Sequence, residues 1–231
     1  IKFNEVKFDE SGYSKEIANY LGTNHHTFFC DLNRGKNLIE DMFHFYDEPF
    51  ADISCVPSML LSQEVKNHVS VALTGDGADE LFCGYSSFAN LSKLEKFLDP
   101  KFDPFIRLPG KIFANPISKY KNIDLTRLFL SEKDLLIDLS CNGFKKREWA
   151  DLIDTDYDPF QHIHKILNEL DGLRPLDKFR ILNLRFKLPY QMLFKVDRAS
   201  MYNSVEARPL FLNNRIIDTA LSISSSVMMQ N

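Results

Sequence analysis

A short apolar segment that runs directly into a glycine- and acid-rich loop is the feature that most constrains the fold of this chain. Residues Val69–Leu73 have the composition of a strand, and Thr74–Glu80 follow at once. Gly75 and Gly77 allow the backbone to approach a ligand closely, with backbone N–H groups available to its oxygen atoms. In open parallel sheets, ligands bind at the carboxyl ends of strands. The segment therefore predicts a parallel sheet with a ligand site at this strand end.

The first 85 residues alternate between amphipathic stretches and short apolar runs, which is typical of a parallel α/β sheet. A first helix is expected after residues 9–11 and ends at Gly22. A second helix covers residues 38–46, and a third begins near Pro57. Between the first two, His26–Cys30 is rich in strand-forming residues and predicts a strand.

From Tyr85 onward, strand signals become sparse, and apolar residues recur at three- and four-residue spacing. This pattern predicts helices over residues 88–98, 123–139, 145–153, 160–170 and 175–188. Proline and glycine in residues 100–122 favour a linker or surface loop there. The sequence thus predicts an α/β part over residues 1–90 and a mainly helical part over residues 91–231.

Charge and apolar pattern argue against several classes of protein. The net charge of −4 is unlike that of a non-specific nucleic-acid-binding protein, which needs a basic face. No apolar run approaches the roughly 18 residues of a membrane helix, so no membrane partner is expected. The four cysteines lack zinc spacing and predict reduced, mostly buried thiols in a cytoplasmic protein. The chain begins at Ile1 and ends without a closing element, which predicts a piece of a longer protein.

The loop after the predicted strand holds three carboxylates, those of Asp76, Asp79 and Glu80. Beside nucleotide phosphates, such groups usually hold Mg²⁺ rather than touch the phosphate itself. The loop is not a Walker A loop, because no Gly-Lys-Ser/Thr sequence ends it. From the spacing alone, a turn with solvated acids explains the segment equally well.

Two further segments carry polar groups in largely apolar surroundings. Residues 195–208 contain Lys195, Asp197 and Glu206, and their spacing alone favours a structural ion-pair network between buried helices. Residues 47–54 precede a predicted helix, where acids and a hydroxyl group are placed to orient a substrate. Taken alone, this second segment is a helix stop followed by an N-cap.

In combination, four segments resemble the synthetase domain of glutamine-hydrolysing asparagine synthetases. They occur in the family's order and span nearly the whole chain. The segments are Phe8–Ser11 with Gly22–His26, Asp47–Pro57, Leu73–Tyr85 and Lys195–Arg208. The resemblance implies a parallel sheet of the adenine-nucleotide alpha-hydrolase or ATP-pyrophosphatase (Rossmann-like) type, followed by a mainly helical C-terminal part.

The resemblance also implies the activity of an ATP-dependent carbon–nitrogen ligase. ATP and the side-chain carboxylate of aspartate would form a β-aspartyl-adenylate and release pyrophosphate, with Mg²⁺ as the second cofactor. Ammonia, released from glutamine by an N-terminal glutaminase (amidotransferase) domain of the same protein, would then attack the adenylate. A homodimer is a further implication of the family, and no nucleic acid takes part.

Particular residues acquire roles from the same resemblance. Asp79 matches the Mg²⁺-binding acid of the family, and Asp76 matches an acid needed for adenylation that is also a candidate base toward ammonia. The residues implied to line the nucleotide are Thr74, Gly75, Asp76 and Gly77. The candidate catalytic residues are Asp76, Lys195, Asp197 and Glu206, and the candidate substrate-binding residues are Asp52 and Ser54.

Parts of the family pattern lie outside these 231 residues. They are a Ser-Gly-Gly-x-Asp-Ser-Ser pyrophosphate loop, a reactive lysine and the glutaminase domain, so we expect the chain alone to be inactive. Residues 50–62 contain no lysine or arginine, and a cation for the α-carboxylate of aspartate has to come from elsewhere.

Two alternatives to an asparagine synthetase stay open. The first is a related ATP-dependent amidotransferase that acts on another carboxylate, of the surface-polysaccharide or β-lactam-forming type. The second is a non-catalytic scaffold that keeps the fold. Against the scaffold, packing does not require acids such as Asp76 and Asp79 at a strand end.

Overall fold

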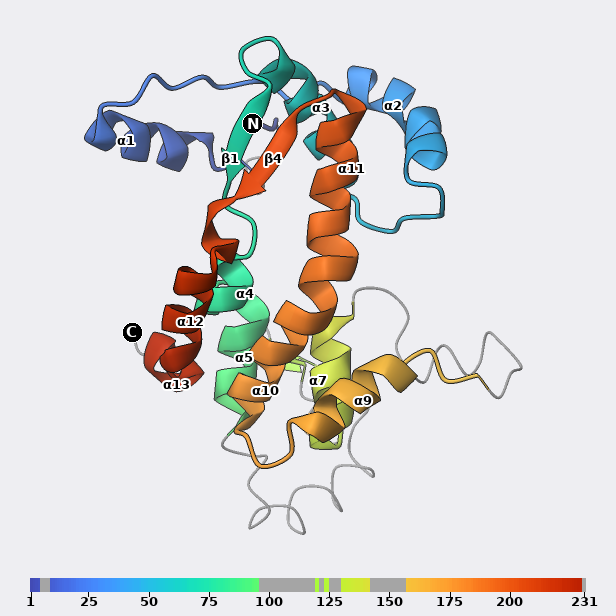
Figure 1. Cartoon of the computed structure of the whole chain (residues 1–231), viewed down its shortest axis with the longest axis vertical. Coiled ribbons are helices and arrows are strands. Elements are labelled where there is room, and N and C mark those ends of the chain that lie inside the picture. The colour runs from blue at the N-terminus through green and yellow to red at the C-terminus, as the bar shows by residue number, and fades with distance from the viewer. Residues whose placement is uncertain (5–8, 96–118, 121–122, 125–129, 142–156, 230–231) are drawn as a thin grey trace. The chain divides into compact units, whose positions relative to one another are not determined.

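The computed structural model describes residues 1–4, 9–95, 119–120, 123–124, 130–141 and 157–229, and Figure 1 shows its helices and strands. The chain divides into two compact units. Unit 1 comprises Ile1–Thr74 and Gln191–Leu210, and unit 2 comprises Gly75–Tyr190 and Phe211–Asn231. The described residues are mostly helical, with a small parallel sheet in unit 1.

The sheet of unit 1 is a parallel pair of short strands (Figure 1). Strand β1 (Val71–Thr74) lies beside β4 (Glu206–Pro209), with Val71 opposite Glu206 and Thr74 opposite Pro209. A parallel pair needs a crossover connection, and here the connecting chain runs from residue 75 to residue 205 and includes most of unit 2 and helix α11 (Phe194–Tyr202). The predicted strand at residues 69–73 and its parallel pairing are confirmed, with the strand starting two residues later.

The described residues of unit 1 form four α-helices. They are α1 (Ser11–Leu21), α2 (Leu32–Phe45), α3 (Cys55–Lys66) and α11 (Phe194–Tyr202). The predicted helix stop at Gly22 is confirmed, because this residue adopts a left-handed φ of 65° that caps α1. The buried core cluster consists of Cys30, Leu38, Tyr46, Cys55, Met59, Leu60 and Ala199.

In unit 1, one predicted strand is not formed and one strand was not predicted. His26–Cys30 is rich in strand-forming residues, yet among the described residues it takes part in one parallel bridge, between Lys2 and Phe29. Conversely, β4 was not predicted, because Glu206–Pro209 lacks the β-branched and aromatic residues of a typical strand. Strand formation in both cases follows the available partner and not the local composition.

Unit 2 is built mainly from helices, as the spacing of apolar residues predicts. They are α4 (Ala78–Phe82), α5 (Ser86–Glu95), α7 (Glu132–Ser140), α9 (Gln161–Glu169), α10 (Pro175–Leu182), α12 (Asn214–Ser222) and α13 (Ser225–Met228). Two short strands that were not predicted, β2 (Lys119–Tyr120) and β3 (Ile123–Asp124), pair antiparallel, so the helix predicted over residues 123–139 does not begin at residue 123. The helix predicted at residues 145–153 and most of the loop predicted at 100–122 lie outside the described residues.

Helix α10 continues into η2 (Asn183–Leu193), a π-helix, and then into α11. Pro189 lies inside η2 and has no N–H for a helical hydrogen bond, which favours a wider helical turn at this point. No described helix combines the length and the apolar character that a membrane crossing requires. Of the four cysteines, Cys30, Cys55 and Cys83 are buried, as expected.

Candidate active site

The acid-rich loop that follows β1 belongs to unit 2 from Gly75 onward. Gly77 is the N-cap of α4 with a left-handed φ of 88°, and a Cβ added to it would overlap the Leu212 side chain. Gly75 differs, because an added Cβ would meet open space. The structure thus explains Gly77 by backbone conformation and packing, while Gly75 keeps an open approach to its backbone.

Helix α4 places a buried carboxylate and an exposed one next to each other in the chain. Glu80 is 1% exposed and accepts a hydrogen bond of 2.7 Å from the hydroxyl of Tyr85. Burial raises the pKa of Tyr85, and the hydrogen bond to Glu80 and the charges of Glu80, Asp79 and Asp76 raise it further. The ammonium of Lys187 lies 3.9 Å from the centre of the Tyr85 ring.

Tyr85 and Lys187 were not among the predicted site residues. Tyr85 lies within a segment that carries the family resemblance, so its position contained a signal. Lys187 lies in η2, more than a hundred positions away in the chain, and no local pattern marks it. A cation over an aromatic ring is favourable, because the negative face of the ring attracts it.

The described residues fit Mg²⁺ in part. Asp79 is exposed, and its carboxylate lies against the α-carbon side of Gly84, where a Cβ would overlap it. Mg²⁺ at nucleotide sites usually takes one or two carboxylates together with phosphate oxygens and water. Among the described residues, no group of three His, Cys, Asp or Glu side chains is arranged to hold a metal. The described residues therefore supply a carboxylate that could bind Mg²⁺ together with phosphate oxygens and water, but they do not supply a complete set of ligands.

Thr74 ends strand β1 and belongs to unit 1. Its hydroxyl is buried and has no hydrogen-bond partner among the described residues. Buried polar atoms without a partner are uncommon in native proteins, since each loses its hydrogen bonds to water. An unpaired hydroxyl at the carboxyl end of a parallel strand fits the predicted role of Thr74 beside a ligand.

Unit 1 brings three of the predicted residues together. Asp52 accepts hydrogen bonds from the Ser54 backbone N–H, at 2.9 Å, and from the Ser54 hydroxyl, at 2.5 Å. The ammonium of Lys195 donates to the Ser54 hydroxyl oxygen at 2.9 Å and lies 3.6 Å from the second Asp52 oxygen. Gln191, which was not predicted, donates to the same Asp52 oxygen at 3.1 Å. We refer to Asp52, Ser54, Gln191 and Lys195 as the Lys195 network.

Buried aromatic residues support this network. Tyr46 is fully buried and donates a 2.9 Å hydrogen bond to the backbone carbonyl of Lys195. Its ring stacks on Phe50 and meets Phe194 edge-on. Because α2 ends at Phe45, directly before Tyr46, these contacts join the end of α2 to the start of α11. The segment that contains Asp52 is thereby packed against the helix that carries Lys195.

Two other predicted residues lie apart from this network. Asp197 is exposed in the first turn of α11. Glu206, on β4, is exposed and pairs with Arg208 at 2.7 Å, and the hydrogen bond from Arg208 lowers the pKa of the Glu206 carboxyl. None of the described contacts joins either residue to Lys195. Within residues 195–208, the described ion pair is the surface pair of Glu206 and Arg208, whereas Lys195 and Arg198 pair with acids of the earlier segment, Asp52 and Asp47.

The environment of Asp52 makes stability depend on pH. Burial by itself raises the pKa of the Asp52 carboxyl, but hydrogen bonds from Ser54, the charge of Lys195 and the Gln191 amide outweigh it, so that the pKa is lowered. A lowered pKa in the folded state contributes stability above the unfolded value of about 4, and this contribution is lost as the pH falls through the folded value. Asp52→Asn is therefore expected to reduce the fall in melting temperature between about pH 5 and pH 2. Equal acid sensitivity of wild type and variant would contradict this.

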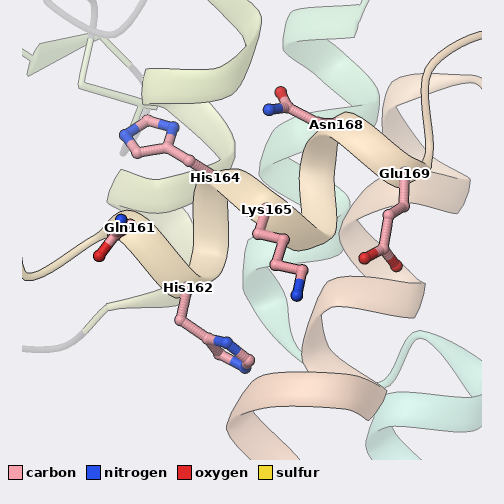
Figure 2. A pocket seen from close by; sticks show the side chains of 6 residues that line it. All are labelled: Gln161, His162, His164, Lys165, Asn168 and Glu169. Atoms are coloured by element: carbon pink, nitrogen blue, oxygen red, sulfur yellow. The ribbon is translucent and has the colours of Figure 1, made fainter.

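A separate cavity of about 750 Å³ lies along α9 in unit 2. Figure 2 shows its lining side chains, all of which project from this helix. They are Gln161, His162, His164, Lys165, Asn168 and Glu169. None of them was predicted as a site residue, and the cavity holds no part of the acid-rich loop or of the Lys195 network.

The strand end with its unpaired hydroxyl, followed by a glycine-rich turn and an exposed acid, is typical of a ligand site at the carboxyl end of a parallel strand. Comparison with known families makes the class specific. Residues 1–231 match the asparagine synthase family, and the chain belongs to that family. Membership implies the adenine-nucleotide alpha-hydrolase fold.

Several curated relatives are similar along most of the chain. A putative glutamine-hydrolysing asparagine synthetase 2 of Methanocaldococcus jannaschii is 32% identical over 203 residues, which cover 85% of this chain and 38% of that protein. The glutamine-hydrolysing asparagine synthetase 1 of Bacillus subtilis is 25% identical over 243 residues, covering 100% of this chain and 37% of that protein. The chain thus spans little more than a third of the length of these relatives. No solved structure matches it.

Proposed function

We propose that this chain is part of a glutamine-hydrolysing asparagine synthetase. In the full-length protein, ATP would adenylate the side-chain carboxylate of aspartate, pyrophosphate would leave, and glutamine-derived ammonia would attack the adenylate to give asparagine. The observation that carries the proposal is the match of all 231 residues to the asparagine synthase family. The relatives from Methanocaldococcus jannaschii and Bacillus subtilis, whose names include glutamine hydrolysis, support the source of ammonia.

The acid-rich loop serves the nucleotide in this proposal. Asp79 would hold Mg²⁺, and Asp76 would act in adenylation and as a base toward ammonia. When bound, Mg²⁺ supplies positive charge that neutralises the leaving pyrophosphate. The backbone of Gly75 is open to a ligand, and the buried Thr74 hydroxyl has a hydrogen bond to offer. Gly77 completes the nucleotide-lining residues.

Lys195 and its neighbours serve the carboxylate substrate. Adenylation requires the acceptor carboxylate to be held in line with the α-phosphorus, because positioning supplies much of the rate enhancement in such transfers. Asp52 and Ser54 are proposed to line the substrate together with Lys195. Asp197 and Glu206 are kept as catalytic candidates, although the described contacts show them on the surface.

Further partners of the full-length protein are part of the same proposal. They are an N-terminal glutaminase domain, a pyrophosphate loop and a reactive lysine outside this sequence, and a second copy of the chain in a homodimer. Because these groups would complete the site, we expect the 231-residue chain alone to release no pyrophosphate from ATP above background. Turnover by the isolated chain would contradict that expectation.

Pyrophosphate release by the full-length protein tests the proposed function. With ATP and Mg²⁺ present, release is expected to depend on aspartate, and Asp79→Asn is expected to abolish it. Asp171→Asn is a matched control, because this exposed carboxylate in unit 2 lies outside the proposed site. Pyrophosphate release that depends on another carboxylate, and not on aspartate, would identify a related amidotransferase. Absence of release with every carboxylate would identify a scaffold.

A further inference from the structure

The fold places a lysine beside residues 50–62, a segment that contains no lysine or arginine. The proposed substrate carries a carboxylate that needs a positive partner. The Lys195 ammonium lies 2.9 Å from the hydroxyl of Ser54, although 141 positions separate the two residues in the chain. Unit 1 thus supplies this cation from α11.

The ammonium keeps capacity to donate a further hydrogen bond. A lysine ammonium has three N–H donors. Among the described residues, its strong acceptor is Ser54, while the Met192 sulfur at 3.7 Å is a weak one. The nearer Asp52 oxygen, at 3.6 Å, is too distant for a hydrogen bond and acts through charge. An anionic oxygen of a ligand would accept a hydrogen bond from a remaining N–H of the ammonium.

Asp52 is occupied by its own chain and is poorly suited to bind substrate. One of its oxygens accepts from the backbone and hydroxyl of Ser54, and the other accepts from Gln191 and faces Lys195. The negative charge of Asp52 would also repel an anionic substrate that contacted it directly. The side chains of Asp52 and Lys195 are 9% and 11% exposed, so their charges interact with little screening by water.

We propose that Lys195 is the group that binds the carboxylate of the acceptor substrate, and that Asp52, Ser54 and Gln191 are positioning residues that hold its ammonium. Asp52 balances the buried charge, Ser54 fixes the direction of one N–H, and Gln191 fixes the Asp52 oxygen that faces the ammonium. This inference rests on the proposed function, which supplies the carboxylate. It changes the role of Asp52 from substrate contact to support of Lys195.

Steady-state kinetics of the full-length protein separate binding of the two substrates. Lys195→Met is expected to raise the KM for aspartate about tenfold or more, the effect of losing roughly one charged hydrogen bond, and to change the KM for ATP less than about twofold. Asp52→Asn and Gln191→Ala are expected to raise the aspartate KM in the same selective way, by smaller factors. Lys66→Met is the control, since Lys66 contacts the Ser204 carbonyl at an exposed position. Equal effects on both substrates, or an effect on ATP alone, would overturn the inference.

Chemical protection gives a readout that needs no turnover. Reductive methylation followed by mass spectrometry would report the access of reagent to Lys195, with Lys66 as the internal reference. Succinate, a dicarboxylate without an amine that would consume the reagent, is expected to protect Lys195 in the wild type and less in Asp52→Asn. Protection by pyrophosphate and not by succinate would assign Lys195 to the nucleotide, and protection by neither would remove its role as an anion-binding group.

The two experiments distinguish the inference from the function on which it rests. Pyrophosphate release without dependence on aspartate would reject the proposed function, while succinate protection would still support a carboxylate site at Lys195. Aspartate-dependent release together with unprotected Lys195 would keep the function and reject the inference. Unaltered protection in Asp52→Asn, with wild-type melting behaviour, would reject the positioning role of Asp52.

Discussion

Gly77→Ala is expected to destabilise unit 2 by about 2–5 kcal/mol. A left-handed backbone conformation costs an alanine roughly 1–2 kcal/mol, and forcing an added methyl group into a packed site costs roughly 1–3 kcal/mol more. Both conditions hold at Gly77, where φ is 88° and the new Cβ would overlap the Leu212 side chain. For a chain of this size, the melting temperature is expected to fall by roughly 10 °C, measured by circular dichroism.

Two variants separate the causes of this effect. Gly75→Ala introduces the same methyl group two positions earlier, where it would meet open space, and is expected to leave the melting temperature nearly unchanged. Adding Leu212→Ala to Gly77→Ala removes the overlap but keeps the left-handed φ, so the pair is expected to cost less than the sum of the single changes. A Gly77→Ala protein that melts like Gly75→Ala would contradict the geometry.

Arg180→Met is expected to destabilise unit 2 by about 2–4 kcal/mol, because hydrogen bonds to charged groups each contribute roughly 1.5–3 kcal/mol. Arg180 lies in α10, is 3% exposed, and donates to the carbonyls of Ala220 and Ile223 at the end of α12. Burial lowers the pKa of its guanidinium. The variant would leave both carbonyls without this donor, so hydrogen exchange is expected to accelerate in the last turn of α12.

Arg185→Met is the matched control for this prediction. Arg185 follows in η2 and pairs with Glu169 at 2.7 Å, with both side chains nearly half exposed. Exposed ion pairs contribute about 0–1 kcal/mol, because water screens them. The control is expected to shift the melting temperature by a few degrees at most. Equal melting temperatures for the two variants would show that Arg180 does not stabilise the end of α12.

Local chemistry was sufficient to predict several elements. The helix end at Gly22 and the strand that runs into the acid-rich loop both depend on neighbouring residues, and both are confirmed. The helical character of much of the second half also follows from spacing along one segment. Beyond these, β4 and the lone bridge at Phe29 depend on a strand partner, which local composition does not specify.

The candidate site likewise contains residues that their motifs predicted and residues that only contacts with remote segments place there. Asp52, Ser54 and Lys195 were each predicted from their motifs, and the structure brings them together. Gln191 was not predicted, because the hydrogen bond that places it in the network joins it to Asp52 at a sequence separation of 139. Lys187 was missed for a similar reason: it contacts the ring of Tyr85, which also belongs to unit 2 but lies far from it in the chain. Side-chain contacts between remote segments leave no periodic signal in a sequence.

The amino-acid sequence by itself determined the family of this protein, the strand that leads into the acid-rich loop and most helices near it. Those features depend on residues that are neighbours in the chain, through helix capping, strand propensity and motif spacing. Tertiary structure decided that β1 pairs with β4, that Gly77 must fit beneath Leu212, and that Lys195 meets Asp52. The physical reason is that packing, burial and charge pairing act across space, where distance along the chain has little influence.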